Sequence, residues 1–462
     1  MSLSLDLARW ATQLRFEDLP ADVVRETKRR VLDVMGLSLA GAETPFGRSV
    51  REATLELSSA GRCRIIGSSS GDKPDGVGVA YAAFTNGAFS QAMEYDDTHN
   101  ESIVHMSSPA VAAALALADA GPITGRELIL AIALGNEISC RVGCVSSGEL
   151  HKRGFHPTGL FATFGAAYLA AKLLRLDADA MARAAGIAGS FASGLLECWV
   201  DGTQTKFLHP GWSAQSGIVA AHLAKAGTTG PAAVFEGRWG LFASHVQSAD
   251  AHRDFSRIDA GLGTHWESRN ASFKPFPSAH VIHPYITAAI RLRQAGIEPS
   301  QIARVDCPVT QFIVTIVCEP TSEKFAPATD SHGRVSLQYS VAEALHFGRL
   351  GKSAYSAESL RNVEILALAR KVHYHVDPAY PGPGRFKGAV KVTLNDGRVV
   401  EELEEYNRGS AENPMTDAEI EAKFDENASG LLGADQRKQL IEQVARLETL
   451  DQAKALMDLA AR

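Results

Sequence analysis

The chain is organised around the stretch Glu94-Tyr95-Asp96-Asp97-Thr98-His99, with His105 following closely. Acidic groups, a hydroxyl group and two imidazoles lie together in this short segment. Ser107-Ser108-Pro109 then has the pattern of a helix start, with a serine N-cap followed by proline, and the apolar run from Pro109 to Leu115 follows. Because the first N–H groups of a helix are free to bind an anion, the stretch predicts a polar loop that leads into a buried helix.

The same pattern recurs three more times along the chain. The loops and the apolar runs behind them are Gly154 to Gly159 before 160–174, Lys206 to Gly211 before 213–226, and Lys274 to His280 before 284–295. Each loop combines proline or glycine with a basic or imidazole side chain. Four such loops predict one cleft lined by cations and helix N-termini, suited to a substrate with several carboxylates. The alternative is that proline and glycine only punctuate helices and that the histidines are ordinary loop residues.

The bulk composition limits the classes of function. The 462 residues suffice for two or three domains, and 45% hydrophobic with 21% charged residues is typical of a globular protein. A net charge of −7 argues against a broad nucleic-acid surface. Six scattered cysteines without a CxxC pair predict buried thiols in a reducing compartment. No signal-peptide pattern or membrane-spanning apolar run is visible, so we expect a cytoplasmic, soluble protein.

The first part of the chain is predicted to be helical. The segments 127–142 and 160–176 are rich in Ala, Gly and Leu, which favours closely packed helices. The pair Arg29-Arg30 is expected on the solvated face of a helix that opens near Leu19-Pro20-Ala21-Asp22. The glycine-rich segment Gly67 to Gly71 lacks the ending of a phosphate-binding loop and is interpreted as a surface loop.

The character of the sequence changes after about residue 267. Val305 to Val317 has a strand composition, and the alternating segments 387–394 and 398–403 flank the turn Asn395-Asp396-Gly397, which predicts a hairpin. Helical segments are expected around 341–347 and 360–372, and a capping box from Thr416 to Glu419 opens further helices. The predicted fold is mainly α, with a large all-helical domain (1–266 and 406–462) and a smaller α+β domain (267–405).

At these loops the sequence resembles the MmgE/PrpD family, which includes 2-methylcitrate dehydratase, cis-aconitate decarboxylase and iminodisuccinate epimerase. The matching segments are Glu94 to His105, Gly154 to Gly159, Thr203 to Lys206 with His209 to Gly211, and Lys274 to His280. They occur in order over nearly the whole chain. The resemblance implies a helical domain with a smaller α+β domain, a homodimer, and an active site between the domains that uses no metal and no organic cofactor.

The resemblance also implies roles for single residues. The residues expected to be catalytic are Lys206, His156, His280 and Asp97, and those expected to bind the substrate are Glu94, Thr98, His105, His209 and Lys274. Glu94 matches a family acid that is often Asp. The decarboxylases have a tyrosine in the strand where this chain has Thr310 to Val314, so Phe312 lacks the hydroxyl group expected there.

The three activities all remove a proton beside a carboxylate, or the carboxylate itself, from a carbon atom. The developing charge needs fixed cations and a base whose pKa lies near the working pH. Lys206 qualifies if burial depresses its pKa, His156 and His280 titrate near neutrality, and Asp97 could orient a histidine. Epimerisation needs no further acid, so the missing hydroxyl at Phe312 favours an epimerase of an iminodisuccinate-type substrate. A dehydratase or decarboxylase of a tricarboxylate is the alternative, since an imidazolium can serve as the acid.

Other classes of function remain as alternatives. Asp96, Asp97, His99 and His105, or the pairs His280/His283 and His373/His375, could bind a metal, but none matches a strong signature such as HExxH. A nucleophilic Cys198 or Cys63 lacks a recognisable partner motif. A non-catalytic helical binding protein would use the polar loops structurally.

Overall fold

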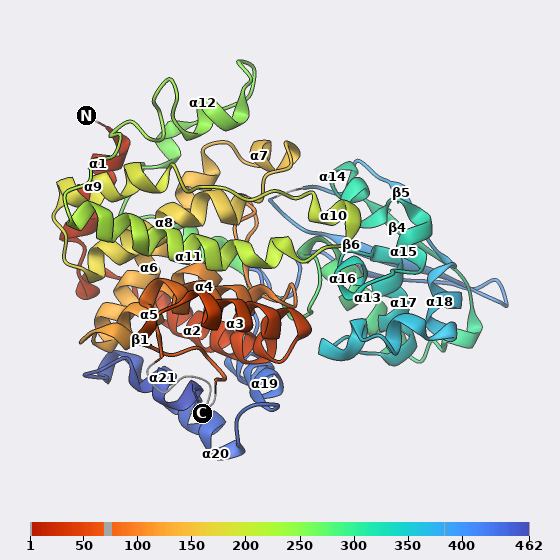
Figure 1. Ribbon diagram of the computed structural model, residues 1–462. Helices are drawn as coiled ribbons and strands as arrows, with labels where there is room; N and C mark the ends of the chain where they lie inside the picture. The colour runs from red at the N-terminus through yellow and green to blue at the C-terminus, as the bar shows by residue number, and fades with distance from the viewer. Residues whose placement is uncertain (1, 69–75, 383, 462) are drawn as a thin grey trace.

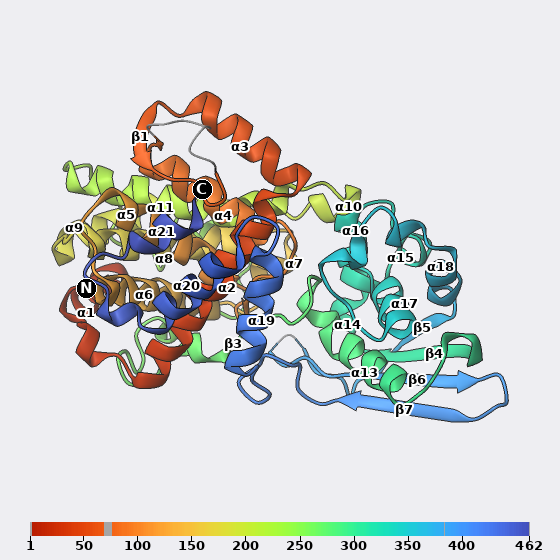
Figure 2. The same cartoon turned by 90° about the horizontal axis from the view of Figure 1, so that it is seen from below.

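The computed structural model describes residues 2–68, 76–382 and 384–461, so part of the Gly67 to Gly71 loop lies outside the described residues. The chain is mainly α-helical, as predicted (Figures 1 and 2). Its apolar residues form two large separate cores. The six cysteines are buried free thiols, also as predicted. Among the described helices, none combines the length and the apolar character needed to cross a membrane.

The first core is built by helices from both ends of the chain. Its longer helices are α1 (Leu3–Gln13), α2 (Ala21–Ala42), α3 (Pro45–Leu57), α4 (Val79–Gln91), α5 (Ser107–Ala120), α6 (Gly125–Cys144), α8 (Pro157–Leu173), α9 (Ala178–Ala188), α11 (His209–Lys225), α19 (Asp417–Ala428) and α20 (Ala434–Ala445). The short elements beside it are β1 (Ala60–Cys63), β2 (Thr98–His99), α7 (Glu149–Lys152), α12 (Leu241–Val246), β3 (Ala271–Ser272) and α21 (Ala455–Ala460), and α10 (Cys198–Asp201) contributes no residue to either large core. The short strands correct the expectation that this part is entirely helical.

The second core combines helices with a four-stranded sheet. Its elements are α13 (His283–Gln294), β4 (Ile302–Val309), α14 (Gln311–Ile313), a π-helix (Val314–Cys318), α15 (Thr321–Phe325), α16 (Asp330–Arg334), α17 (Leu337–Phe347), α18 (Val363–Ala369), β5 (Val372–Val376), β6 (Gly388–Leu394) and β7 (Val399–Glu404). The strand order is β5-β4-β6-β7, with β4 parallel to β5 and antiparallel to β6. Figure 2 shows α13 and α17 beside this sheet.

Local sequence signals account for several of these elements. The predicted hairpin is confirmed as the antiparallel pair β6–β7. The predicted capping box is confirmed at α19, where Thr416 and Glu419 each bond the other's backbone N–H. The strand predicted over 305–317 is confirmed only as far as Val309, where β4 ends. The chain becomes helical at Gln311, so Phe312 lies on α14 rather than on a strand. Strand composition persists past the end of β4, so β-branched residues alone did not mark the boundary.

Two close contacts bring the polar loops together. Helices α4 and α11 cross at Gly87 and Gly211, where a Cβ atom on Gly211 would lie 2.1 Å from the carbonyl oxygen of Phe84. This approach places the loop before α11 beside the end of α4. Strands β2 and β3 pair antiparallel, with Thr98 opposite Ser272. The pairing joins the stretch around Glu94 to the segment that carries Lys274.

Candidate active site

Glu94 lies at the centre of a buried cluster with two lysines. Lys206 Nζ donates to both carboxylate oxygens, at 2.5 Å for Oε2, and Lys274 Nζ lies 3.3 Å from Oε1. Burial alone would raise the pKa of Glu94, but the charges of Lys206 and Lys274 outweigh burial and hold that pKa well below its usual range. Burial lowers the pKa of Lys274, although Glu94 opposes the shift. Two ammonium groups sharing one carboxylate leave a positive site that suits an anionic substrate.

His105 lies between two carboxylates. Its Nδ1 atom is 3.1 Å from Asp96 Oδ1, and its Nε2 atom is 3.8 Å from Glu94 Oε1. Thr98 Oγ1 is 3.5 Å from the same Nδ1 atom. Burial would raise the pKa of Asp96, but the adjacent His105 lowers it overall. Asp96 therefore orients the imidazole through its contact with Nδ1.

The expectation that Asp97 would orient a histidine is wrong. Asp97 forms a buried ion pair with Arg30 and accepts a hydrogen bond from Ser107 Oγ at 2.5 Å. Neighbouring side chains in an extended segment point to opposite sides, so Asp96 faces His105 while Asp97 faces α2 and α5. The predicted serine cap is corrected here too, because α5 already begins at Ser107 and the Ser107 hydroxyl binds Asp97 instead.

His156 and His209 form a neutral imidazole pair. Their Nδ1 atoms are 2.9 Å apart, so one donates to the other, and the His105 and His156 rings lie 5.5 Å apart. Burial first, and then the charge of Lys206, lowers the pKa of His156 well below its usual value and that of His209 to about 4. Within the described chain His156 Nε2 is buried without a hydrogen-bond partner. This nitrogen is the atom available to a ligand.

His280 is a second neutral imidazole with a free nitrogen. Its Nε2 atom lies 2.8 Å from Asn407 Nδ2, and no described residue bonds its buried Nδ1 atom. An amide that donates to Nε2 leaves the ring proton on Nδ1. Burial, followed by the neighbouring His283 and Lys274, lowers the pKa of His280 well below its usual value. Asn407 gave no sequence signal, because it follows β7 more than a hundred residues after His280.

A pocket reaches Glu94 and Lys206 between the two cores. Its wall includes Phe207 from the first core, Val335 from the second, and Trp199, His332 and Arg334. Further out, the ring of His151 lies 5.4 Å from that of Trp199 and 6.0 Å from that of Phe312. Phe312 therefore lies near the edge of the site.

Eight of the nine site residues expected from the sequence are connected to one another in the structure by contacts or by the effect of one charge on another. Asp97 alone faces elsewhere.

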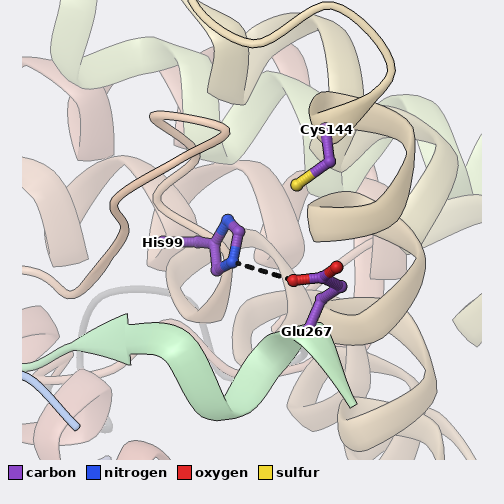
Figure 3. Close-up of side chains that lie close together, drawn as sticks. All are labelled: His99, Cys144 and Glu267. Atoms are coloured by element: carbon purple, nitrogen blue, oxygen red, sulfur yellow. Dashed lines mark ion pairs between the residues drawn. The ribbon is translucent and has the colours of Figure 1, made fainter. Parts of the chain in front are cut away.

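One buried cluster has donor atoms of the kind that bind metals. His99, Cys144 and Glu267 place such atoms within 4.8 Å of one another (Figure 3), and His99 Nε2 lies 3.7 Å from Glu267 Oε2. However, Arg257 Nη2 lies 2.9 Å from Glu267 Oε1 and already balances this carboxylate. Burial raises the pKa of the Cys144 thiol, which disfavours the thiolate that a metal needs. The cluster is therefore an ion-pair network.

Arg30 is a buried residue that the sequence interpretation placed on the solvated face of its helix. Its side chain is 4% exposed, its Nη2 atom donates to Ala271 O at 3.2 Å, and its guanidinium lies over the ring of Phe273. A signal was available, because Arg30 shares a helix face with the buried Val23, Thr27 and Val34. Arg30 thus ties α2 to the stretch around Asp97.

Replacing this cation tests its structural role. Arg30→Met leaves the Asp97 carboxylate buried without its ion-pair partner, and we expect the free energy of unfolding in urea to fall by about 3–5 kcal/mol. The matched control is Arg25→Met on the same helix, because the Arg25–Asp417 pair is 59% and 58% exposed and is worth at most about 1 kcal/mol. Equal losses in the two variants would contradict the buried pairing.

Comparison with known proteins relates this chain to a known family. The MmgE/PrpD N-terminal domain matches residues 5–254, and the MmgE/PrpD C-terminal domain matches residues 276–449. A cis-aconitate decarboxylase of Aspergillus terreus is 28% identical, covering 98% of this chain and 95% of the relative. The human cis-aconitate decarboxylase is 27% identical, covering 96% and 92%. The 2-methylcitrate dehydratase of Salmonella typhimurium is 24% identical over 71% of each chain. The chain therefore belongs to the MmgE/PrpD family.

Proposed function

We propose that the protein is a lyase that acts on a small tricarboxylate, first as a decarboxylase of cis-aconitate and alternatively as a dehydratase of a 2-methylcitrate-type substrate. The observation that carries the proposal is the pair of buried ammonium groups of Lys206 and Lys274 around Glu94, next to imidazoles with unpartnered nitrogens. The near full-length similarity to cis-aconitate decarboxylases supports the first choice, and the shorter match to the dehydratase supports the second.

Sequence alone favoured an epimerase, and the comparisons give that preference no support. It depended on the missing hydroxyl group at Phe312, which left no evident acid. The geometry supplies other acids, because Lys206 and Lys274 both carry protons beside the carboxylate of Glu94. A tyrosine hydroxyl is therefore not needed for a step that protonates carbon or a leaving hydroxyl group.

The site can perform a lyase reaction with its own side chains. Lys274 and Lys206 would bind substrate carboxylates and stabilise the charge that develops on the carbon framework. In decarboxylation, carbon dioxide leaves with its bond electrons remaining on carbon, and a proton from Lys206 or His105 quenches that carbanion. In dehydration, neutral His156 would take the proton next to a carboxylate while an ammonium group protonates the departing hydroxyl, and the Nδ1–H group of His280 would donate a hydrogen bond to the substrate. Both routes require no metal and no organic cofactor.

The assembly of the chain is part of the same proposal. Two separate cores support a division into two domains, for which we propose residues 1–266 with 406–462 and residues 267–405. Ala271 and Phe273 nevertheless pack in the first core, so the cores favour a first boundary somewhat after residue 267. The pocket lined by Lys206 and Arg334 then lies between these domains. The homodimer implied by the family resemblance is also proposed, and sedimentation of the purified protein measures it.

The reaction type is tested by product analysis. Purified protein is incubated separately with cis-aconitate, 2-methylcitrate and iminodisuccinate in deuterated buffer and followed by NMR, with a carbon dioxide trap and a parallel reaction containing a chelator. We expect carbon dioxide release from cis-aconitate that the chelator does not reduce. Loss of water from 2-methylcitrate alone would select the dehydratase. Inversion at a carbon of iminodisuccinate without either product would overturn the lyase proposal.

Replacing His156 tests the role of its free nitrogen. His156→Gln keeps a polar side chain but removes the titrating imidazole, and we expect kcat to fall by about 100-fold. His222→Gln is the control, because His222 is an exposed histidine on α11 that bonds the carbonyl oxygen of Ile218. Near wild-type turnover by His156→Gln would remove this residue from the mechanism.

A further inference from the structure

Three buried cations hold three consecutive carbonyl groups of the loop that carries Glu94. The donor–acceptor pairs are Arg334 Nη1 with Met93 O at 2.8 Å, Lys274 Nζ with Glu94 O at 3.1 Å, and Lys423 Nζ with Tyr95 O at 2.9 Å. The cations come from α16 in the second core, from the segment after β3, and from α19 near the C-terminus. Each of these residues is at most 5% exposed.

The backbone of this loop adopts a conformation that needs external support. Glu94 has a φ of +54°, in the left-handed region that non-glycine residues rarely occupy. Such a conformation persists only where surrounding contacts over-determine it. The left-handed residue is also the one whose carboxylate meets Lys206, so the geometry of this backbone turn decides where the carboxylate lies.

The two more distant cations are themselves anchored. Lys423 Nζ forms an ion pair with Asp33 Oδ1 at 2.7 Å, across to α2, and lies over the ring of Tyr95. Arg334 Nη1 also donates to Pro277 O at 2.8 Å, in the segment between Lys274 and His280. Each cation therefore joins the loop to a second part of the site. Arg334 in addition links the loop to the second core.

We propose that Lys423 and Arg334 are positioning residues that hold the backbone of residues 93–95 so that Glu94 can orient Lys206. Neither side chain reaches the Glu94 carboxylate, so both act through the main chain. The turnover part of this inference rests on the proposed lyase function, whereas the part about backbone order stands without it.

The test separates positioning from a purely structural ion pair. Lys423→Met leaves the Asp33 carboxylate buried without its partner. The double variant Lys423→Met/Asp33→Asn removes both charges. Removing both charges of a buried ion pair restores much of the stability that is lost when only one is removed. If the pair were only structural, the double variant would recover both melting temperature and kcat. We expect it to recover the melting temperature but to keep a kcat at least about tenfold below wild type, because small displacements of catalytic groups are costly. Lys423→Arg, which keeps a donor, should regain part of kcat.

Hydrogen exchange gives a readout that needs no substrate. We expect faster amide exchange confined to residues 92–98 in the double variant and in Arg334→Gln, which removes a cation that has no carboxylate partner among the described residues. Lys438→Met, at a 77% exposed side chain on α20, is the control. Wild-type exchange over residues 92–98 in both variants would overturn the proposal even if one of them turned over poorly. If no tricarboxylate is converted by the wild type, the lyase proposal fails while this measurement still decides the positioning role.

Discussion

Lys206→Met is expected to lower kcat/KM for the converted tricarboxylate by at least about 100-fold, because the variant loses the ammonium group that faces Glu94 and the pocket. Methionine keeps most of the length and volume of lysine, so the buried space stays filled. Lys274 still lies 3.3 Å from Glu94 Oε1 and continues to balance its charge. The chain should therefore remain folded, and the loss should appear in turnover rather than in yield.

A second substitution separates charge from proton transfer. Lys206→Arg keeps a cation that can bind a carboxylate, but a guanidinium does not give up its proton near neutral pH. If Lys206 donates a proton, Lys206→Arg should retain substrate binding with a KM within about threefold of wild type and still lose kcat nearly as fully as Lys206→Met.

Controls for Lys206 come from the same region of the chain. Lys225→Met, at an exposed position near the end of α11, should leave both constants at wild-type values. Full activity of Lys206→Arg would show that only the positive charge matters. Full activity of Lys206→Met would remove this residue from the reaction and leave Lys274 and His105 as the remaining proton donors of the site.

The sequence predicted the loops of the site better than the contacts within them. Four helix starts were predicted from loops that combine proline or glycine with a cationic or imidazole side chain before an apolar run. The structure has α5, α8, α11 and α13 at these places. These signals are local, because caps and proline positions act within one turn of a helix. The same local character explains why the β6–β7 hairpin and the capping box at Thr416 were found.

Contacts between distant segments could not be predicted in this way. Asp96 and Asp97 are adjacent and chemically identical, and only the path of the backbone shows which one faces His105. Lys423 lies more than three hundred residues from the carbonyl oxygen it binds. The tertiary contact with Asp33 buries it, and no local pattern indicates this contact. The tertiary structure decides which charged side chains pair, and the periodicity of the sequence does not indicate these pairs.

The Arg30 and Phe312 predictions failed for different physical reasons. Arg30 was assigned to solvent because arginine is rarely buried, although its position on the α2 helix face already indicated the core. Phe312 was assigned to a strand because β-branched and aromatic residues surround it, yet the chain turns into a helix two residues after Val309. The first error ignored periodicity, and the second relied on composition where only tertiary structure sets the boundary.

Glu94→Gln is expected to shift the alkaline limb of the pH–activity profile toward lower pH and to lower kcat. Burial already lowers the pKa of Lys274, and Glu94 is the first group that opposes this shift. Without the carboxylate, the lysine pKa falls further, so the ammonium form is lost at a lower pH than in the wild type. The pH dependence of kcat/KM measures this limb. Glu298→Gln, at an exposed glutamate that pairs with Arg293, is the control and should leave the profile unchanged.

The same substitution has a signed effect on stability. In Glu94→Gln the buried lysine has a lower pKa in the folded chain than in the unfolded chain, so the unfolded chain binds more protons between these two values. Stability of the variant should therefore rise with pH in that interval. We expect a loss of about 3–5 kcal/mol relative to wild type at neutral pH, shrinking as the pH approaches the ordinary lysine pKa near 10.4. Urea unfolding from pH 7 to 10 measures the trend. A loss that stays constant or grows with pH would show that Glu94 is not the counter-charge of these ammonium groups.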